Sequence, residues 1–266
     1  MTLSKALTSP LTPHSSLLTN PFGTLASLMA IKVVLFDLDG TLVKAGGSGR
    51  KALNHAVRRL HGFKEVCSTF SLEGRMDRQN FRLAFENATG RRATAADIRQ
   101  VESAYLARLP HEVEKAVRLK RYLEIPGVSR LLRALSKRRG VMLGLGTGNI
   151  KEGAHIKLGP SGLLPYFTFG GYGRDGRSRS HMLRLATRKA ELLAGRKVAA
   201  KHVFVIGDTA RDVLAARRAG FKAGVVIDGY GDEAAIRRTR PDLLARDFRD
   251  TRLWLRWILV PGTGNL

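Results

Sequence analysis

The chain has 266 residues, of which 46 are Lys or Arg and 22 are Asp or Glu, so its formal net charge is +24. Its length and its hydrophobic content of 44% suffice for one large or two modest folded domains, which excludes a chain that is disordered throughout. The positive charge alone would favour a nucleic-acid partner, but the basic residues are spread over residues 43–266 with few aromatic residues among them. We therefore expect no specific nucleic-acid function.

Cys67 is the only cysteine, so an intrachain disulfide is excluded and a cytoplasmic location is expected. No apolar run reaches the length of about 18 residues that a membrane-spanning helix needs, so no membrane partner is expected. Residues 1–30 are rich in Ser and Thr, lack acidic residues and have no regular hydrophobic period, which predicts a disordered leader. Two interpretations stay open: either translation begins at Met29, or the leader directs the protein to an organelle.

Four short apolar runs bounded by turn residues are typical of buried parallel strands. They cover residues 31–37, 141–147, 202–208 and 223–228, and a last short strand is expected within residues 241–248. Segments with helical periodicity, each followed by a glycine, occur at residues 129–139, 180–193 and 210–219. This alternation predicts an α/β fold with a doubly wound, Rossmann-like parallel sheet as its core. Trp254 and Trp257 are expected on the core face of a final helix.

Polar residues follow three of the predicted strands. They are Asp37 and Asp39 after the first strand, Thr147, Gly148 and Asn149 after the second, and Asp208 and Asp212 after the third. Because the carboxyl ends of parallel strands meet at one edge of a sheet, we expect these groups to lie together. Clustered carboxylates repel one another unless a cation or a proton lies between them, and their hard oxygen atoms favour Mg²⁺ over zinc.

These segments resemble three motifs of the haloacid dehalogenase-like (HAD) superfamily, and in particular its phosphoglycolate-phosphatase-like hydrolases. Asp37-Leu38-Asp39-Gly40-Thr41 matches the first motif, Thr147-Gly148-Asn149 the second, and Gly207-Asp208-Thr209 with Asp212 the fourth. The resemblance implies that Asp37 attacks phosphorus and becomes an aspartyl phosphate. It also implies that Asp39 acts first as general acid and then as general base.

The resemblance further implies a Mg²⁺ site and a phosphate-binding loop. The metal would be held by the Asp37 side chain, the Asp39 backbone carbonyl and Asp208, with support from Asp212. Thr147 and the backbone of Gly148 would hold phosphate oxygens, and Asn149 completes the expected substrate-binding loop.

The third motif departs from the Lys-Pro dipeptide that many relatives have. Residues 171–180 instead resemble a variant with Gly-Phe-Gly and a downstream Asp-Arg pair, which gives Arg179 the role of the cation beside the nucleophile. An Arg side chain can bridge an aspartate and a phosphate. Arg177, Lys157 and Lys189 are the alternative cations.

Residues 44–125 are expected to form a helical cap inserted into the core, which comprises residues 31–43 and 126–260. The predicted helices of the cap cover residues 50–60, 78–88, 94–108 and 111–122, and its hinges lie near residues 43–49 and 124–127. Within the cap, Gly74-Arg75-Met76-Asp77 resembles a Gly-Arg-Thr-Asp turn that faces the active site of related phosphatases. Arg75 is therefore our candidate for contact with an anionic part of the substrate.

Together these features predict a Mg²⁺-dependent phosphomonoester hydrolase that acts on a small phosphorylated metabolite, such as phosphoglycolate or a sugar phosphate, through an aspartyl phosphate. One alternative is a phosphomutase of the β-phosphoglucomutase type, which protects the same intermediate from water. The other is a catalytically silent, basic binding module. The sequence does not predict the oligomeric state.

Overall fold

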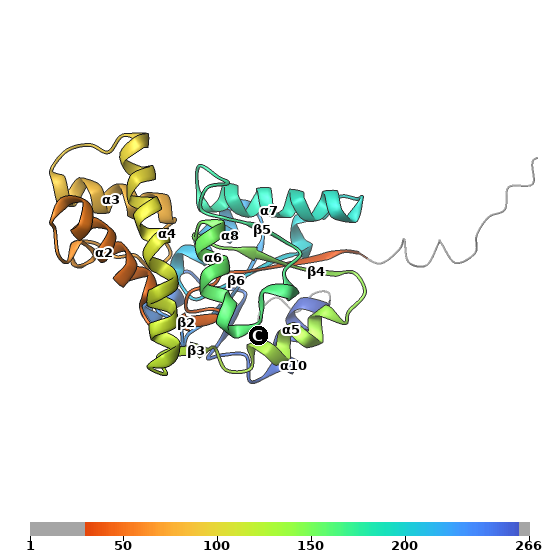
Figure 1. Cartoon of the computed structure of the whole chain (residues 1–266). Helices are drawn as coiled ribbons and strands as arrows, with labels where there is room; N and C mark the ends of the chain where they lie inside the picture. Colours follow the sequence, from red (N-terminus) through yellow and green to blue (C-terminus); the bar gives the residue numbers. More distant parts are fainter. Residues whose placement is uncertain (1–29, 261–266) are drawn as a thin grey trace, which may run out of the picture.

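The computed structural model describes residues 30–260, and its core is a six-stranded parallel sheet (Figure 1). In spatial order the strands are β5 (Phe169–Gly171), β4 (Val141–Gly146), β1 (Lys32–Phe36), β6 (Val203–Gly207), β7 (Lys222–Val226) and β8 (Leu243–Ala245). The predicted doubly wound α/β core is therefore confirmed, including the short last strand. The predicted leader lies, except for Ala30, outside the described residues.

The central strand β1 shows why its sequence lacks the alternation of a half-exposed strand. Val33 and Leu35 pack into one hydrophobic cluster, while Val34 and Phe36 pack into another on the opposite face of the sheet. Since both faces are covered, every position of the strand favours an apolar side chain.

Helices cover the two faces of the sheet. On the face of Val33 lie α7 (Arg179–Ala194), α8 (Ala210–Ala219) and α9 (Glu233–Arg238). On the face of Val34 lie α5 (Val128–Ser136), α6 (Lys151–Leu158) and α10 (Thr251–Leu259). Trp254 and Trp257 of α10 are buried there, as the sequence predicts. Among the helices of residues 30–260, none has the length and apolar character needed to cross a membrane.

A group of helices between β1 and β4 extends to one side of the sheet (Figure 1). It consists of α2 (Ser48–His61), α3 (Asp77–Thr89) and α4 (Ala95–Arg118). These helices share a hydrophobic cluster of their own, in which Phe81, Phe85 and Tyr105 are buried. The described residues also contain four single turns of 3-10 helix: η1 (Val66–Ser68), η2 (Gly159–Ser161), η3 (Leu164–Tyr166) and η4 (Ala200–His202).

The two chain segments that connect the sheet with these helices pair with each other. They are β2 (Val43–Ala45) and β3 (Tyr122–Glu124), which form a two-stranded antiparallel sheet. β2 lies within residues 43–49 and β3 ends at residue 124, which are the places where the sequence predicts hinges.

One expected helix boundary is wrong. The sequence predicts separate helices over residues 94–108 and 111–122. A proline inside a helix lacks a backbone donor and usually ends or bends the helix. The structure has instead the single helix α4 with Pro110 inside it. Leu109 and Val113 on either side of the proline are buried in the helical cluster, so packing along one continuous face outweighs the lost hydrogen bond.

Candidate active site

The three polar segments predicted to meet do so because of the strand order. β1 lies between β4 and β6 and is parallel to both. Asp37, Thr147 and Asp208 each follow directly after one of these strands. All three residues therefore leave the sheet at the same edge, where ligands bind in doubly wound folds.

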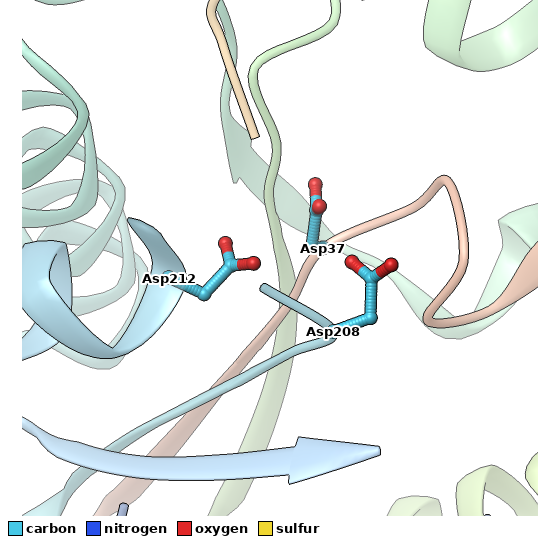
Figure 2. Close-up of side chains that lie close together, drawn as sticks. All are labelled: Asp37, Asp208 and Asp212. Atoms are coloured by element: carbon cyan, nitrogen blue, oxygen red, sulfur yellow. The ribbon is translucent and has the colours of Figure 1, made fainter. Parts of the chain in front are cut away.

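Asp37, Asp208 and Asp212 form a buried carboxylate cluster. One carboxylate oxygen of each lies within 4.8 Å of the others, and Figure 2 shows the three side chains gathered around one space. Burial raises the pKa of Asp37 to about 6, with a further increase from Asp212, although Arg179 opposes the shift. Burial also raises the pKa of Asp208 well above its ordinary value, and both neighbouring carboxylates add to the shift. The cluster is therefore short of positive charge.

Local backbone geometry holds two of these carboxylates in place. Asp212 lies in the first turn of α8, where its Oδ2 accepts hydrogen bonds from the Thr209 amide at 3.0 Å and the Thr209 hydroxyl at 2.7 Å. This capping box leaves the other oxygen, Oδ1, directed away from the helix end. Asp208 Oδ2 accepts a hydrogen bond from the Tyr230 amide at 2.7 Å.

Gly40 in the first motif is required by its conformation and by its neighbour. Its φ is +79°, and a Cβ at this position would lie 2.1 Å from Asp208 Oδ2. A side chain here would displace the carboxylate, so the glycine of Asp37-Leu38-Asp39-Gly40-Thr41 makes room for the cluster.

The cluster fits a divalent cation with hard oxygen ligands. Asp212 Oδ1 is buried, and its side chain pairs with the Arg179 guanidinium. Three converging carboxylates of this kind suit Mg²⁺, whereas zinc sites usually contain Cys or His. The Asp39 side chain is not part of the cluster, so its expected contribution to the metal is limited to its backbone carbonyl.

We predict that protons compete with Mg²⁺ at this cluster. Because the metal binds the ionised carboxylate and the pKa of Asp37 is about 6, the apparent dissociation constant should increase as the pH falls below 6. The increase should reach about tenfold per pH unit for each proton displaced. Calorimetric titration of Mg²⁺ between pH 5 and pH 8 measures this change, and equal affinities at both limits would contradict the prediction.

Arg179 supplies the cation beside Asp37. Its guanidinium is 9% exposed, and Nη2 lies 3.0 Å from Asp37 Oδ2 and 2.5 Å from Asp212 Oδ1. Burial lowers the pKa of Arg179, but the adjacent Asp212 and Asp37 raise it more, so the group stays charged. Of the alternative cations, Lys189 pairs with Asp175.

The loop after β4 links the two aspartates of the first motif. Thr147 hydrogen-bonds with Asp37. The side-chain amide of Asn149 donates to Thr147 Oγ1 at 2.9 Å and to Asp39 Oδ2 at 3.0 Å. Lys157, an alternative cation for the third motif, instead lies at Asp39, where its Nζ is 2.6 Å from Oδ2. Arg179 thus pairs with Asp37, and Lys157 pairs with Asp39.

A cavity of about 280 Å³ lies over these groups and is lined by both the sheet edge and the inserted helices. Arg75 lines it, and its Nε donates to the Ser71 carbonyl. Two further lining residues, Ser48 and Asn80, are buried, and Ser48 Oγ and Asn80 Oδ1 have no hydrogen-bond partner among the described residues. No sequence pattern singles out these two residues, since single Ser and Asn residues on helices are common.

Gly148 allows the helical segment of residues 44–125, which we call the insert, to lie close to the core. Its carbonyl accepts a hydrogen bond from the Asp77 amide at 2.8 Å, and a Cβ on Gly148 would lie 2.4 Å from the Arg75 carbonyl oxygen. Overlap of this kind with backbone atoms cannot be relieved by a side-chain rotation.

We therefore predict that Gly148→Ala pushes the turn of residues 74–77, which contains Arg75, away from the core. The free energy of unfolding should fall by about 1–3 kcal/mol, measured by chemical denaturation. Gly159→Ala is the matched control, because a Cβ there has no neighbour within 4 Å. Equal stability of the two variants would contradict the close approach.

Known proteins resemble this chain in family and in fold. A family model described as haloacid dehalogenase-like hydrolase matches residues 31–220. Comparison with curated proteins gives no match. Similar solved structures include a predicted phosphatase from Clostridium acetobutylicum, with a TM-score of 0.65, 17% identity, and coverage of 86% of this chain and 100% of that chain.

A predicted phosphoglycolate phosphatase from Haemophilus somnus has a TM-score of 0.63 and 20% identity, and the match covers 84% of this chain and 97% of that chain. A candidate β-phosphoglucomutase from Bacteroides vulgatus has a TM-score of 0.63 and 17% identity, with coverage of 89% and 91%. At these identities the likeness concerns the fold.

Proposed function

Since the chain belongs to the haloacid dehalogenase-like hydrolases, we propose that it is a Mg²⁺-dependent phosphatase of small phosphate monoesters in which Asp37 is the nucleophile. One observation carries the proposal. Asp37 lies at the edge of the sheet between a buried guanidinium, that of Arg179 at 3.0 Å, and two further carboxylates that suit a metal. A nucleophilic oxygen, a fixed cation and a metal site in contact are the parts that phosphoryl transfer needs.

The reaction proceeds in two halves. An Asp37 oxygen forms a bond to phosphorus while the bond from phosphorus to the ester oxygen breaks, and Asp39 gives its proton to the departing alkoxide. Asp39 then takes a proton from water, whose oxygen attacks phosphorus and releases Asp37 and inorganic phosphate. Bound Mg²⁺ supplies the positive charge that offsets the repulsion between the nucleophile and the phosphate dianion.

The neighbouring groups of the chain hold the phosphoryl oxygens. Arg179 and Thr147 both contact Asp37, so an oxygen on the phosphorus attacked by Asp37 comes within reach of both. The amide of Gly148 and the side chain of Asn149 belong to the same loop. These donors are held in place before the substrate arrives, which favours the transition state.

The helices of residues 44–125 act as a cap that selects the alcohol part of the ester. They supply one wall of a cavity of about 280 Å³, a volume that suits a small leaving group. Arg75 can pair with a carboxylate, as in phosphoglycolate, while the unpartnered Ser48 Oγ and Asn80 Oδ1 can bind hydroxyl groups, as in a sugar phosphate. The lone cysteine and the soluble substrate class favour the cytoplasm as the place of action.

The experiment is a panel of phosphate esters assayed for phosphate release with Mg²⁺ and with EDTA. It should contain phosphoglycolate, several sugar phosphates and p-nitrophenyl phosphate. We expect hydrolysis of at least one small ester and its loss in EDTA. Failure of every ester, or activity that is unchanged in EDTA, would overturn the proposal.

A phosphomutase is the second candidate, because the fold resembles that of the candidate β-phosphoglucomutase and the mutase reaction uses the same aspartyl phosphate. The two activities differ in product. A mutase converts one sugar phosphate into its isomer without net release of phosphate, so chromatography of the sugar-phosphate reactions separates them.

A further inference from the structure

Lys157 is a buried ammonium in the cavity that has no part in the mechanism above. It lies on α6 of the core and is 5% exposed. Its Nζ donates to Asp39 Oδ2 at 2.6 Å and to Asn149 Oδ1 at 2.7 Å. Burial alone lowers the pKa of Lys157, but Asp39, Tyr105 and Asp77 raise it more, so the group stays charged. A buried ammonium lowers the stability of the fold unless its ion-pair and hydrogen-bond partners are in place.

Lys157 also contacts the inserted helices and one of the connecting strands. A Cβ on Gly49, at the start of α2, would lie 3.1 Å from Nζ, so this glycine leaves room for the ammonium. Tyr105 of α4 forms a hydrogen bond with Lys157. The Lys157 carbonyl accepts a hydrogen bond from the Tyr122 hydroxyl of β3 at 2.8 Å. One residue of the core thus joins the insert, its connecting strand and Asp39.

The hydrogen bonds to Asp39 are asymmetric. Those from Lys157 and Asn149 both end on Oδ2. Asp39 keeps a side-chain exposure of 33% even though Lys157 is buried. Two fixed donors on one oxygen orient the carboxyl plane, so the proton transfer is left to the other oxygen, Oδ1.

We infer that Lys157 is a positioning residue, which aligns Asp39 for proton transfer only while α2 and α4 lie over the site. This inference rests on the proposed function. Gly49 of α2 and Tyr105 of α4 cover Lys157 from the side of the insert. Movement of α2 and α4 would therefore expose the ammonium to water and weaken its hydrogen bond to Asp39 Oδ2. Placement of the cap and alignment of the acid are in this way coupled through a single side chain.

The test compares two esters with different needs for an acid. Alkyl phosphates need a proton on the leaving oxygen, whereas p-nitrophenyl phosphate has a leaving group that departs without one. In Lys157→Met the ratio of kcat/KM for the alkyl ester to kcat/KM for p-nitrophenyl phosphate should fall at least about tenfold. Weaker phosphate binding and partial unfolding lower both values equally and cancel in the ratio. Lys151→Met, an exposed residue of the same helix, is the matched control and should keep the wild-type ratio.

A double-mutant cycle checks that Lys157 acts through Asp39. Asp39→Asn should lower the same ratio, and adding Lys157→Met to it should change the ratio by less than about twofold. A wild-type ratio in Lys157→Met, or a further tenfold loss in the double variant, would overturn the inference. If the wild-type protein hydrolyses no ester, the proposed function fails instead, so the two failures are distinguishable.

Discussion

Asp37→Asn should lower phosphate release by about 10⁴-fold or more while leaving the fold at least as stable as that of the wild type. The amide cannot form the phosphoryl intermediate, so the loss is in kcat. Stability should not fall in EDTA, because burial and the charge of Asp212 both disfavour the ionised form of Asp37. A neutral amide at this position removes that cost. Steady-state kinetics and thermal unfolding in EDTA measure the two effects on the same preparation.

The matched control is Asp228→Asn. Asp228 also follows a strand of the sheet, β7, but it pairs with exposed Arg246 and is not part of the carboxylate cluster. Its activity should stay within a small factor of wild type. Activity retained in Asp37→Asn, or a large drop in its melting temperature, would contradict the role given to this residue.

Arg179→Met should destabilise the protein by about 3–5 kcal/mol in EDTA, because it leaves Asp37 and Asp212 buried without their cation. Added Mg²⁺ should recover part of this loss, since a bound cation replaces the missing charge. Activity with Mg²⁺ should still fall about 10²-fold or more, because a fixed donor to the phosphoryl oxygens is gone. Chemical denaturation with and without Mg²⁺ measures the stability effects.

Arg177→Met provides the control for that measurement, because Arg177 is exposed and two residues away. Its effect on stability should be within about 0.5 kcal/mol. Equal effects of the two substitutions, or a loss in Arg179→Met that Mg²⁺ does not change, would mean that Arg179 is not the counter-charge of the cluster.

Much of the core could be predicted because its signals are local. The apolar runs that became β1, β4, β6 and β7 are buried on both faces, and each is followed by turn residues, so strand ends and polar residues could be placed together. The convergence of Asp37, Thr147 and Asp208 then follows from parallel topology alone.

Other elements gave weaker signals. Strand β5 has only the three residues Phe169–Gly171, two of them glycines, and the helix α6 is short. The continuity of α4 through Pro110 depends on packing with α2 and α3, which no local pattern reports.

The position of Lys157 could not be predicted because its partner Asp39 is 118 residues away in the chain. As one of several basic residues after the second motif, it could be proposed only as an alternative to Arg179. The structure separates the two: Arg179 contacts Asp37 and Lys157 contacts Asp39. Cavity residues such as Ser48 and Asn80 likewise acquire meaning only when two distant segments meet.

The most direct test of the central claim is mass spectrometry of peptides from protein mixed with an ester that it hydrolyses and quenched in acid within the first turnover. Asp39→Asn serves as a second sample, because loss of the base should slow release of the phosphoryl group. We predict one phosphoryl group on the peptide that contains Asp37 and none in Asp37→Asn. With p-nitrophenyl phosphate, whose leaving group needs no acid, Asp39→Asn should carry more of it than the wild type. Hydrolysis without a phosphoryl group on this peptide in any sample, or a phosphoryl group on a different residue, would contradict the account.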